Sequence, residues 1–372
     1  MKVVFLSNSF NHYQKALSDE LYRVLGSDYV FMESVEQSQD RIRLGWKELD
    51  APYKKSLYKI GDEAALSLIN EADAVVYGTN FPLRLIRQRE RKGKLILVCT
   101  ERLLKKGDGF SVFFPRLLKY NYFFPYRKNV YLLCMGAYVY RDYRRMGLFK
   151  GRGFQYGYFP AKKTLEIDAL LAAKKPNSLV WVGRMIDWKH PELAIDTAEQ
   201  LRAGNVPFHL KMIGTGELLD SMAKLVQEKH LENDVEVLGP RSPEEVRQYM
   251  EEAEVFLFTS DRNEGWGVVL NEAMNSGCVP IADRSIGAAP YLISDRENGL
   301  VYEREEEIPE LIKYLFKEKD KRAAIAENAY KTITDLWNPC VAAERLVALI
   351  NCIQSDGDYK NLYPDGPCKY IE

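Results

Sequence analysis

The chain has 372 residues, of which 46% are hydrophobic and 28% are charged, with 24 glycines and 16 prolines. This composition is typical of a folded globular protein and excludes collagen-like, fibrous and disordered chains. At roughly 100 to 200 residues per domain, the length predicts two domains that each bury a core of their own.

The net charge of −1 conceals two halves of opposite charge. Residues 1–165 carry 29 Lys and Arg against 16 Asp and Glu, whereas residues 166–372 carry 23 against 37. A basic first half suits an anionic lipid surface, a phosphorylated acceptor or a nucleic acid, and charge alone does not choose among them.

Compartment and redox state follow from the apolar runs and the cysteines. The apolar run after Met1-Lys2 is too short for a signal peptide, and no run reaches the ~18 residues of a membrane span. We therefore expect a cytoplasmic protein. The six cysteines lie far apart without a CxxC pair, which favours reduced core thiols over disulfides or a zinc site.

Short apolar runs that end in Gly, Thr or Asn alternate with longer amphipathic stretches along the chain. This alternation is typical of parallel β-sheets covered by helices, and it predicts two doubly wound α/β domains. The expected strands are residues 3–7, 74–78, 95–100 and 130–135 in the first half, and 178–183, 210–214, 235–239, 255–259 and 279–282 in the second.

The two sets of strands are separated where the charge changes sign. Residues 161–175 form a charged, helix-like stretch that is closed by Pro176-Asn177. We therefore place a first domain at 1–160, a linker at 161–177 and a second domain at 178–336. The rest, 337–372, is a helix over 337–354 and a polar tail, which we expect to pack back on the first domain.

The segment from Glu264 to Glu272, Glu-Gly-Trp-Gly-Val-Val-Leu-Asn-Glu, is the most informative part of the chain. A strand, a glycine turn and a helix that opens near Gly267 would aim free backbone N–H groups at one point, where phosphate binds. The two glutamates, eight positions apart, reach different parts of one ligand. Carboxylates accept from hydroxyls, so the ligand is expected to be polyhydroxylated.

Compensating cations lie one strand earlier, in Gly183-Arg-Met-Ile-Asp-Trp-Lys189. Arg184 offers planar bidentate donors and Lys189 a compact charge, which together suit a pyrophosphate. Gly214-Thr-Gly216 forms another turn at a strand's carboxyl end, the edge where open α/β sheets bind ligands. It lacks the GxGxxG spacing of a dinucleotide-binding turn.

These motifs, followed by Asn298-Gly-Leu-Val-Tyr302, resemble in their order the donor domain of family 4 retaining glycosyltransferases. The resemblance covers about residues 178–345. It implies the GT-B architecture, in which two Rossmann-like domains face each other across a cleft. The first domain then binds the acceptor, and the second binds a nucleoside-diphosphate sugar as co-substrate, with no metal and no resident cofactor.

The resemblance also assigns roles to individual residues. Glu264 would contact the transferred sugar near its anomeric carbon and Glu272 the ribose hydroxyls, while Arg184 and Lys189 would bind the pyrophosphate. The remaining donor-binding positions are Gly265, Trp266, Gly267, Val268, Gly214, Leu238 and Arg241. A front-face mechanism is the family expectation, and a covalent carboxylate intermediate is the alternative.

The first domain departs from the family pattern. Its first strand is followed by Asn8-Ser-Phe-Asn instead of a Gly-Gly turn, and Glu101-Arg102 stand where many members have a histidine. His12 could orient or deprotonate an acceptor hydroxyl, or it could simply cap a helix. His12, Glu101 and Arg102 are therefore the acceptor candidates.

Residues 84–152 hold 18 Lys and Arg against 4 Asp and Glu, with aromatic residues interleaved over 110–128. Such a segment can bind a membrane surface, or it can be a core-facing helix with a solvated basic face. No motif supports a nucleic-acid partner.

Two hypotheses follow. The first is a glycosyltransferase of surface polysaccharide or glycolipid synthesis, with a glycan or lipid-linked acceptor at the inner face of the membrane. The second is a non-catalytic nucleotide-sugar-binding subunit of a synthase assembly.

Overall fold

The computed structural model describes residues 1–36, 49–78, 80–105, 109–123 and 129–372. The chain divides into two compact units, each built around a β-sheet of its own. The first unit combines Met1–Ala161 with Trp337–Glu372, and the second is Lys162–Leu336.

The second unit is built on a parallel sheet of six strands in the order β10-β9-β8-β11-β12-β13. The central strand β11 reads Val-Phe-Leu-Phe and is buried along its whole length, as expected for a strand covered on both faces. The strands are β8 (Ser178–Val182), β9 (His209–Ile213), β10 (Val235–Gly239), β11 (Val255–Phe258), β12 (Val279–Asp283) and β13 (Leu300–Tyr302).

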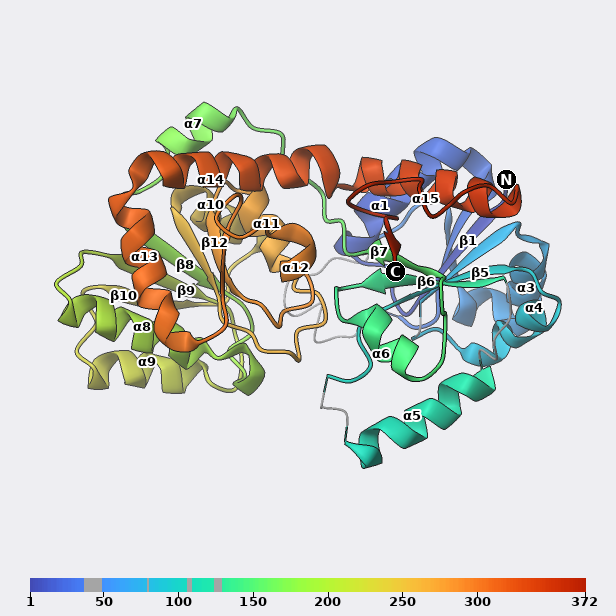
Figure 1. The fold of residues 1–372 in the computed structure, drawn as a ribbon, viewed down its shortest axis with the longest axis horizontal. Coiled ribbons are helices and arrows are strands. Elements are labelled where there is room, and N and C mark those ends of the chain that lie inside the picture. The colour runs from blue at the N-terminus through green and yellow to red at the C-terminus, as the bar shows by residue number, and fades with distance from the viewer. Residues whose placement is uncertain (37–48, 79, 106–108, 124–128) are drawn as a thin grey trace. The chain divides into compact units, whose positions relative to one another are not determined.

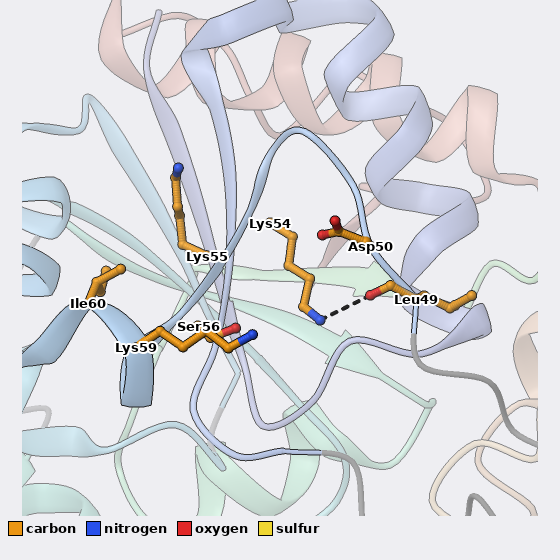
Figure 2. Close-up of a pocket in the computed structure, with 7 residues that line it drawn as sticks. All are labelled: Leu49, Asp50, Lys54, Lys55, Ser56, Lys59 and Ile60. Atoms are coloured by element: carbon orange, nitrogen blue, oxygen red, sulfur yellow. Dashed lines mark hydrogen bonds between the residues drawn. The ribbon is translucent and has the colours of Figure 1, made fainter.

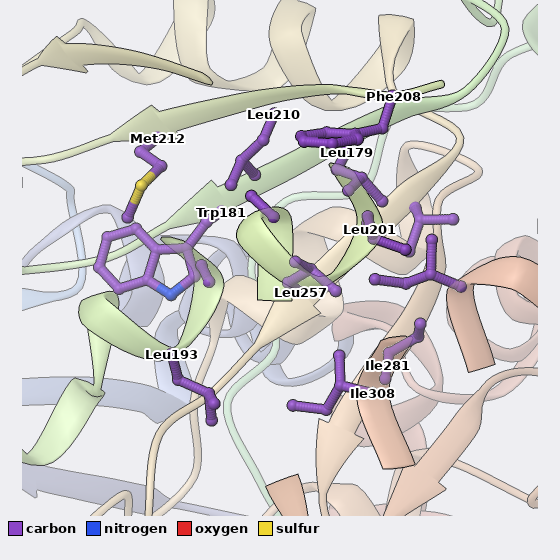
Figure 3. Packing of buried hydrophobic residues seen from close by; sticks show 14 of the residues in the cluster. Leu179, Trp181, Leu193, Leu201, Phe208, Leu210, Met212, Leu257, Ile281 and Ile308 are labelled. Atoms are coloured by element: carbon purple, nitrogen blue, oxygen red, sulfur yellow. The ribbon is translucent and has the colours of Figure 1, made fainter. Parts of the chain in front are cut away.

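Helices cover both faces of this sheet (Figure 1). One face carries α8 (Pro191–Ala203), α9 (Leu219–Glu228) and α13 (Ile308–Lys317), which enclose the apolar cluster around Trp181 and Leu257 (Figure 3). The other face carries α10 (Pro243–Glu252), α11 (Val269–Asn275) and α14 (Lys319–Lys331). Shorter elements are α7 (Ile167–Ala172), η3 (Asp187–Lys189), α12 (Ala289–Leu292), η4 (Glu305–Glu307) and η5 (Thr332–Leu336).

The first unit has an eight-stranded sheet in the order β14-β7-β6-β5-β4-β1-β2-β3, in which only β14 is antiparallel to its neighbour. The strands are β1 (Val3–Ser7), β2 (Tyr29–Glu33), β3 (Lys54–Ser56), β4 (Ala74–Gly78), β5 (Leu95–Thr100), β6 (Val130–Met135), β7 (Gly153–Tyr156) and β14 (Tyr370–Ile371). The C-terminal tail therefore supplies the last strand of this sheet.

Helices α1 (His12–Leu25) and α15 (Pro339–Gln354) pack together on one face of the first sheet. On the other face lie α3 (Leu57–Glu71), α4 (Arg87–Arg91), α5 (Phe110–Phe123) and α6 (Val139–Arg145) (Figure 1). Apolar residues of α3, α5 and α6 join those of β4 to β6 in one cluster. Two short turns, η1 (Gly26–Asp28) and η2 (Leu83–Leu85), complete the unit.

The prediction of two doubly wound α/β domains is confirmed.

Three helix boundaries need correction. The charged stretch 161–175 is helical only over Ile167–Ala172, because the backbone before it binds unit 2 side chains: Lys163 N–H donates to Asn275 Oδ1 (2.8 Å) and Leu165 N–H to Tyr330 Oη (2.7 Å). The helix after the glycine turn begins at Val269, two residues later than expected. The last helix begins at Pro339, not at residue 337, because Asn338 accepts from Val341 N–H and caps it.

Strands β2, β3, β7, β13 and β14 were not expected from the sequence.

Among the described residues no single helix is long and apolar enough to cross a membrane. Only the pair Lys319–Leu336 and Pro339–Gln354, bent by 44°, has that length and composition when taken together.

Candidate active site

The strand order of the second unit reverses at β8, which pairs with β9 on one side and β11 on the other. Such a reversal is a topological switch point, and in open α/β sheets ligands bind beyond the carboxyl ends of the strands there. The loops that leave β8 and β11 carry Arg184, Lys189 and Glu264. The topology therefore brings the residues singled out by sequence to one edge of one sheet.

Glycines fit the loops after β8 and β9 tightly against each other. Gly214 has φ +147°, and a Cβ there would lie 1.8 Å from the Gly183 carbonyl oxygen. Gly216 has φ +156°, and its Cβ would lie 2.2 Å from the Met185 carbonyl oxygen. The Met185 N–H donates to the Thr215 carbonyl at 2.9 Å. No larger residue fits at Gly214 or Gly216 unless the loops move apart.

The turn after β11 is held in the same way by the loop after β12. A Cβ on Gly287 would lie 1.8 Å from the Gly265 carbonyl oxygen, and the Gly287 N–H donates to the Glu264 carbonyl at 3.1 Å. The Trp266 side chain is 1% exposed and donates from Nε1 to Asn271 Oδ1 at 2.9 Å. The sequence analysis missed Gly287 because it lies outside the recognised motifs. It missed Asn271, which lies within one of them, because that residue is neither charged nor part of the glycine turn.

Lys189 and Glu264 form an ion pair although 75 positions separate them in the chain. Their side chains are only 11% and 12% exposed, so the pair is shielded from water. The Lys189 backbone is fixed as well, because its carbonyl accepts from Thr259 Oγ1 at 2.7 Å, and that hydroxyl accepts from Trp181 Nε1 at 2.8 Å. The cation and the carboxylate thus meet at the switch point on a rigid backbone.

Two further polar residues border this pair. Arg184 is exposed, with its guanidinium 5.7 Å from the centre of the Trp188 ring. His190 has φ +47° and lies with Nδ1 3.0 Å from Glu192 Oε1 and Nε2 3.6 Å from Asp261 Oδ2. Burial alone would lower the pKa of His190, but the two carboxylates outweigh it and raise the pKa.

Glu272 lies in the first turn of α11 and has an unusual protonation equilibrium. Burial raises its pKa to about 7, and the nearby Arg247 guanidinium offsets this only in part. Arg247 donates instead to the Glu272 backbone carbonyl and to Asn275 Oδ1, both at 2.8 Å. At neutral pH the Glu272 carboxyl is therefore divided between its neutral and ionised forms.

The other donor candidates lie at the same edge. Gly267 has φ +94°, and a Cβ there would come within 2.5 Å of Phe258 Cζ. Leu238 is half-buried at the end of β10, and the carbonyl of the next residue, Gly239, accepts from Gly214 N–H at 3.0 Å. Arg241 is exposed and donates to the Pro240 carbonyl. Val268 is half-buried and immediately precedes α11.

The three acceptor candidates of the first unit lie in different settings. His12 is the first residue of α1, after β1, with its ring 3.9 Å from that of Tyr13. Glu101 pairs with Lys105 and accepts from Tyr158 Oη at 3.1 Å. Arg102 is 7% exposed, with Nε 3.5 Å from the buried Asp142 carboxylate, which indicates a structural ion pair.

A pocket of about 520 Å³ in the first unit was not anticipated (Figure 2). Its most buried cation is Lys54, which donates to the Leu49 carbonyl at 3.0 Å and pairs with Glu33 at 3.1 Å. The sequence analysis did not select Lys54 and Lys55, because adjacent lysines in a sequence usually lie on a solvated surface. The pocket is lined by Leu49, Asp50, Lys54, Lys55, Ser56, Lys59 and Ile60.

No group of three or more His, Cys, Asp or Glu side chains that could hold a metal ion occurs in the part of the chain that the structure describes. The polar groups expected to bind a ligand at the switch point are two carboxylates, two cations and backbone amides. A polyhydroxylated, anionic ligand such as a nucleoside-diphosphate sugar matches this set. Fold and site together thus define a protein with two parallel-sheet α/β units, as in the GT-B class, whose second unit carries charged side chains at its switch point.

Comparison with known proteins agrees with this class. Residues 162–332, which make up most of the second unit, match the family model "Glycosyl transferases group 1". One relative is WcaL of Escherichia coli, designated a colanic acid biosynthesis glycosyltransferase, with 26% identity over 49% of this chain and 47% of WcaL. Another is the amylovoran biosynthesis glycosyltransferase AmsK of Erwinia amylovora, with 30% identity over 38% and 36%. The chain spans less than half of the length of these relatives.

Solved structures resemble the whole chain. Anabaena Alr3699/HepE, crystallised with UDP and glucose, has a TM-score of 0.67 at 14% identity, over 94% of this chain and 99% of that one. WaaG, a glycosyltransferase involved in lipopolysaccharide biosynthesis, has a TM-score of 0.61 at 18% identity, over 92% and 98%. At these identities the likeness confirms the GT-B fold alone.

Proposed function

We propose that this protein is a retaining glycosyltransferase of family 4. It transfers a hexosyl group from a nucleoside-diphosphate sugar to a hydroxyl acceptor, without a metal ion, during polysaccharide or glycolipid synthesis. The acceptor is a glycan or a lipid-linked glycan, and the protein works in the cytoplasm, at the inner face of the membrane. The observation that carries the proposal is the shielded pair of Lys189 and Glu264 at the switch point of a glycosyltransferase domain.

The pair has a direct use in such a reaction. A bound pyrophosphate would compete with Glu264 for the Lys189 ammonium, and the freed carboxylate could then accept from hydroxyls of the transferred sugar. Positive charge at Lys189 and Arg184 is placed where negative charge grows as the diphosphate departs, which stabilises the transition state. The helix α11 is only seven residues long, so we assign this role mainly to the side-chain cations.

The proposed step breaks the bond between the anomeric carbon and the diphosphate oxygen and forms a bond from that carbon to the acceptor oxygen. In a front-face reaction the acceptor proton passes to the departing phosphate, so the protein needs no base of its own. Glu272 would hold the ribose hydroxyls, and the amides of Gly265 to Val268 would contact sugar and phosphate. His12 and Glu101 remain our acceptor candidates, whereas the buried ion pair of Arg102 favours a structural role.

A non-catalytic nucleotide-sugar-binding subunit is the competing hypothesis. The relatives designated as glycosyltransferases support the enzyme instead. So do the two cations and two carboxylates at the switch point, since a binding subunit has no need to keep all four.

The deciding experiment measures nucleoside-diphosphate release from UDP-, GDP-, ADP- and dTDP-sugars, with and without a chelator. We expect release from one donor that persists with the chelator and disappears in Glu272→Ala. The exposed Glu232 offers a matched control, since Glu232→Ala should release nucleotide like the parent. Release lost on chelation would refute metal independence. Tight nucleotide binding without turnover, even with lipid-linked acceptors, would favour the non-catalytic subunit.

The raised pKa of Glu272 predicts the pH dependence of donor binding. Only the ionised carboxylate can accept from two ribose hydroxyls, and with a pKa of about 7 it is mostly protonated at pH 6 and mostly ionised at pH 8. Donor binding should therefore be about tenfold tighter at pH 8 than at pH 6. Calorimetry with the active nucleotide sugar would measure this, because its pyrophosphate does not titrate in that range.

The control for this prediction is Glu272→Gln, which should bind with little pH dependence. Any remaining dependence would report His190, whose protonation at low pH should favour the anionic donor and thus has the opposite sign. An equal change of donor affinity with pH in the parent and in Glu272→Gln would contradict the assignment of Glu272 to the ribose.

A further inference from the structure

Helix α5 (Phe110–Phe123) carries apolar residues on two faces, of which the core uses only one. Phe113 and Leu117 pack against the apolar core of the first unit, and the helix is anchored there by Asn121 Nδ2, which donates to the Met146 carbonyl at 3.1 Å. This inward face accounts for the attachment of the helix to the unit. It does not account for the apolar residues on the adjoining face.

The adjoining face consists of Phe114, Leu118 and Tyr122, which are 42%, 58% and 60% exposed. Their spacing of four residues places them in one row along the helix, which we call the α5 face. Across the described residues, seven large hydrophobic side chains are exposed, and three of them stand in this row. Scattered exposed hydrophobics need no explanation, but a continuous row marks an interaction surface.

Two basic residues adjoin the α5 face. Lys119 is exposed beside Leu118, and Arg87 lies against Tyr122, with its guanidinium 4.5 Å from the ring centre and Nη2 2.6 Å from the hydroxyl. The wider segment 84–152 has 18 basic and 4 acidic residues, of which Arg89 and Arg102 are buried and residues 106–108 and 124–128 lie outside the described part. A partner protein with an apolar groove would not need this excess of positive charge.

We propose that the α5 face docks the protein on an anionic lipid bilayer, with Phe114, Leu118 and Tyr122 at headgroup depth. Aromatic and aliphatic side chains beside cations are the combination that binds the membrane–water interface. Each basic residue near an anionic surface adds about 1 kcal/mol, so the contact should weaken as salt rises. The inference rests on the proposed function only for its purpose, which is to bring the enzyme to a lipid-linked acceptor.

The test is sedimentation of the full chain with vesicles, either of phosphatidylcholine alone or of phosphatidylcholine and phosphatidylglycerol in equal parts. We expect binding to the anionic vesicles that weakens with salt and falls at least about tenfold in Leu118→Glu, which places a charge in the row. The control is Leu165→Glu, a change at an exposed leucine of the second unit, which should bind like the parent. Leu118→Trp adds a direct reading, since its fluorescence should shift to the blue on vesicles.

Equal binding by the parent and Leu118→Glu, or no binding to anionic vesicles, would overturn the proposal. A change of oligomeric state in Leu118→Glu, with vesicle binding unaltered, would make the α5 face an interface between copies. Nucleotide release without vesicles, measured on the same samples, tests the proposed function separately. It should be unchanged in Leu118→Glu, which also shows that the variant is folded.

Discussion

Replacing Lys189 with methionine should lower the turnover number by about 100- to 1,000-fold, the usual cost of removing one preorganised charge that stabilises a developing anion. The Lys189 ammonium is shielded, paired with Glu264, and supported through its backbone by Thr259. Among the described residues no other cation is paired with Glu264, and Arg184 is exposed, so we expect it to replace Lys189 only in part. Steady-state release of the nucleoside diphosphate, at saturating donor, is the measurement.

Two controls separate catalysis from structure. Lys163→Met removes a cation from an exposed pair with Glu251 in the same unit and should leave turnover within a factor of about two. Lys189→Met also leaves the Glu264 carboxylate without its cation. The second control is therefore the double variant Lys189→Met with Glu264→Gln, in which that carboxylate is removed as well. Recovery of full turnover in the double variant would show that Lys189 only neutralises Glu264, and our assignment to the pyrophosphate would be wrong.

Replacing Arg89 with methionine should destabilise the first unit by on the order of 4 kcal/mol, because several buried carbonyls lose their donors together. The Arg89 side chain has no exposed surface and donates to the carbonyls of Ile69, Ala72, Asp73 and Leu95 at 2.6–3.1 Å. The first two lie at the C-terminal end of α3, where the helix dipole favours a cation. Burial lowers the pKa of Arg89 to about 10, so it remains charged at neutral pH.

Urea unfolding followed by circular dichroism would measure this loss of stability. Arg91→Met, two residues further along the same helix, is the control, since Arg91 is exposed and its loss should cost less than about 0.5 kcal/mol. The loss of stability in Arg89→Lys should lie between the losses in Arg91→Met and Arg89→Met, because one ammonium cannot reach four carbonyls. A midpoint for Arg89→Met equal to that of Arg91→Met would show that the carbonyls find other donors.

The buried parallel strands could be predicted from sequence almost to the residue. Strands β1, β4, β5 and β6 have the expected bounds, because a strand covered on both faces must be apolar throughout. The edge strand β10 also has the expected bounds, although its Glu236 is exposed. Strand β3 could not be found in this way. It reads Lys-Lys-Ser at the edge of the sheet, and only in the folded chain does its Lys54 form a buried ion pair with Glu33 of β2.

The site divides along the same line. The residue types that follow each strand, and hence the cations, carboxylates and glycines that suit a nucleotide sugar, can be identified along the chain without a structure. The ion pair of Lys189 with Glu264, the close approach of Gly287 to Gly265, and the burial that moves the pKa of Glu272 to about 7 appear only in the folded protein. The physical reason is range: the apolar pattern of a strand is local along the chain, whereas contacts between loops and the desolvation of a carboxyl depend on the order in which distant strands pair.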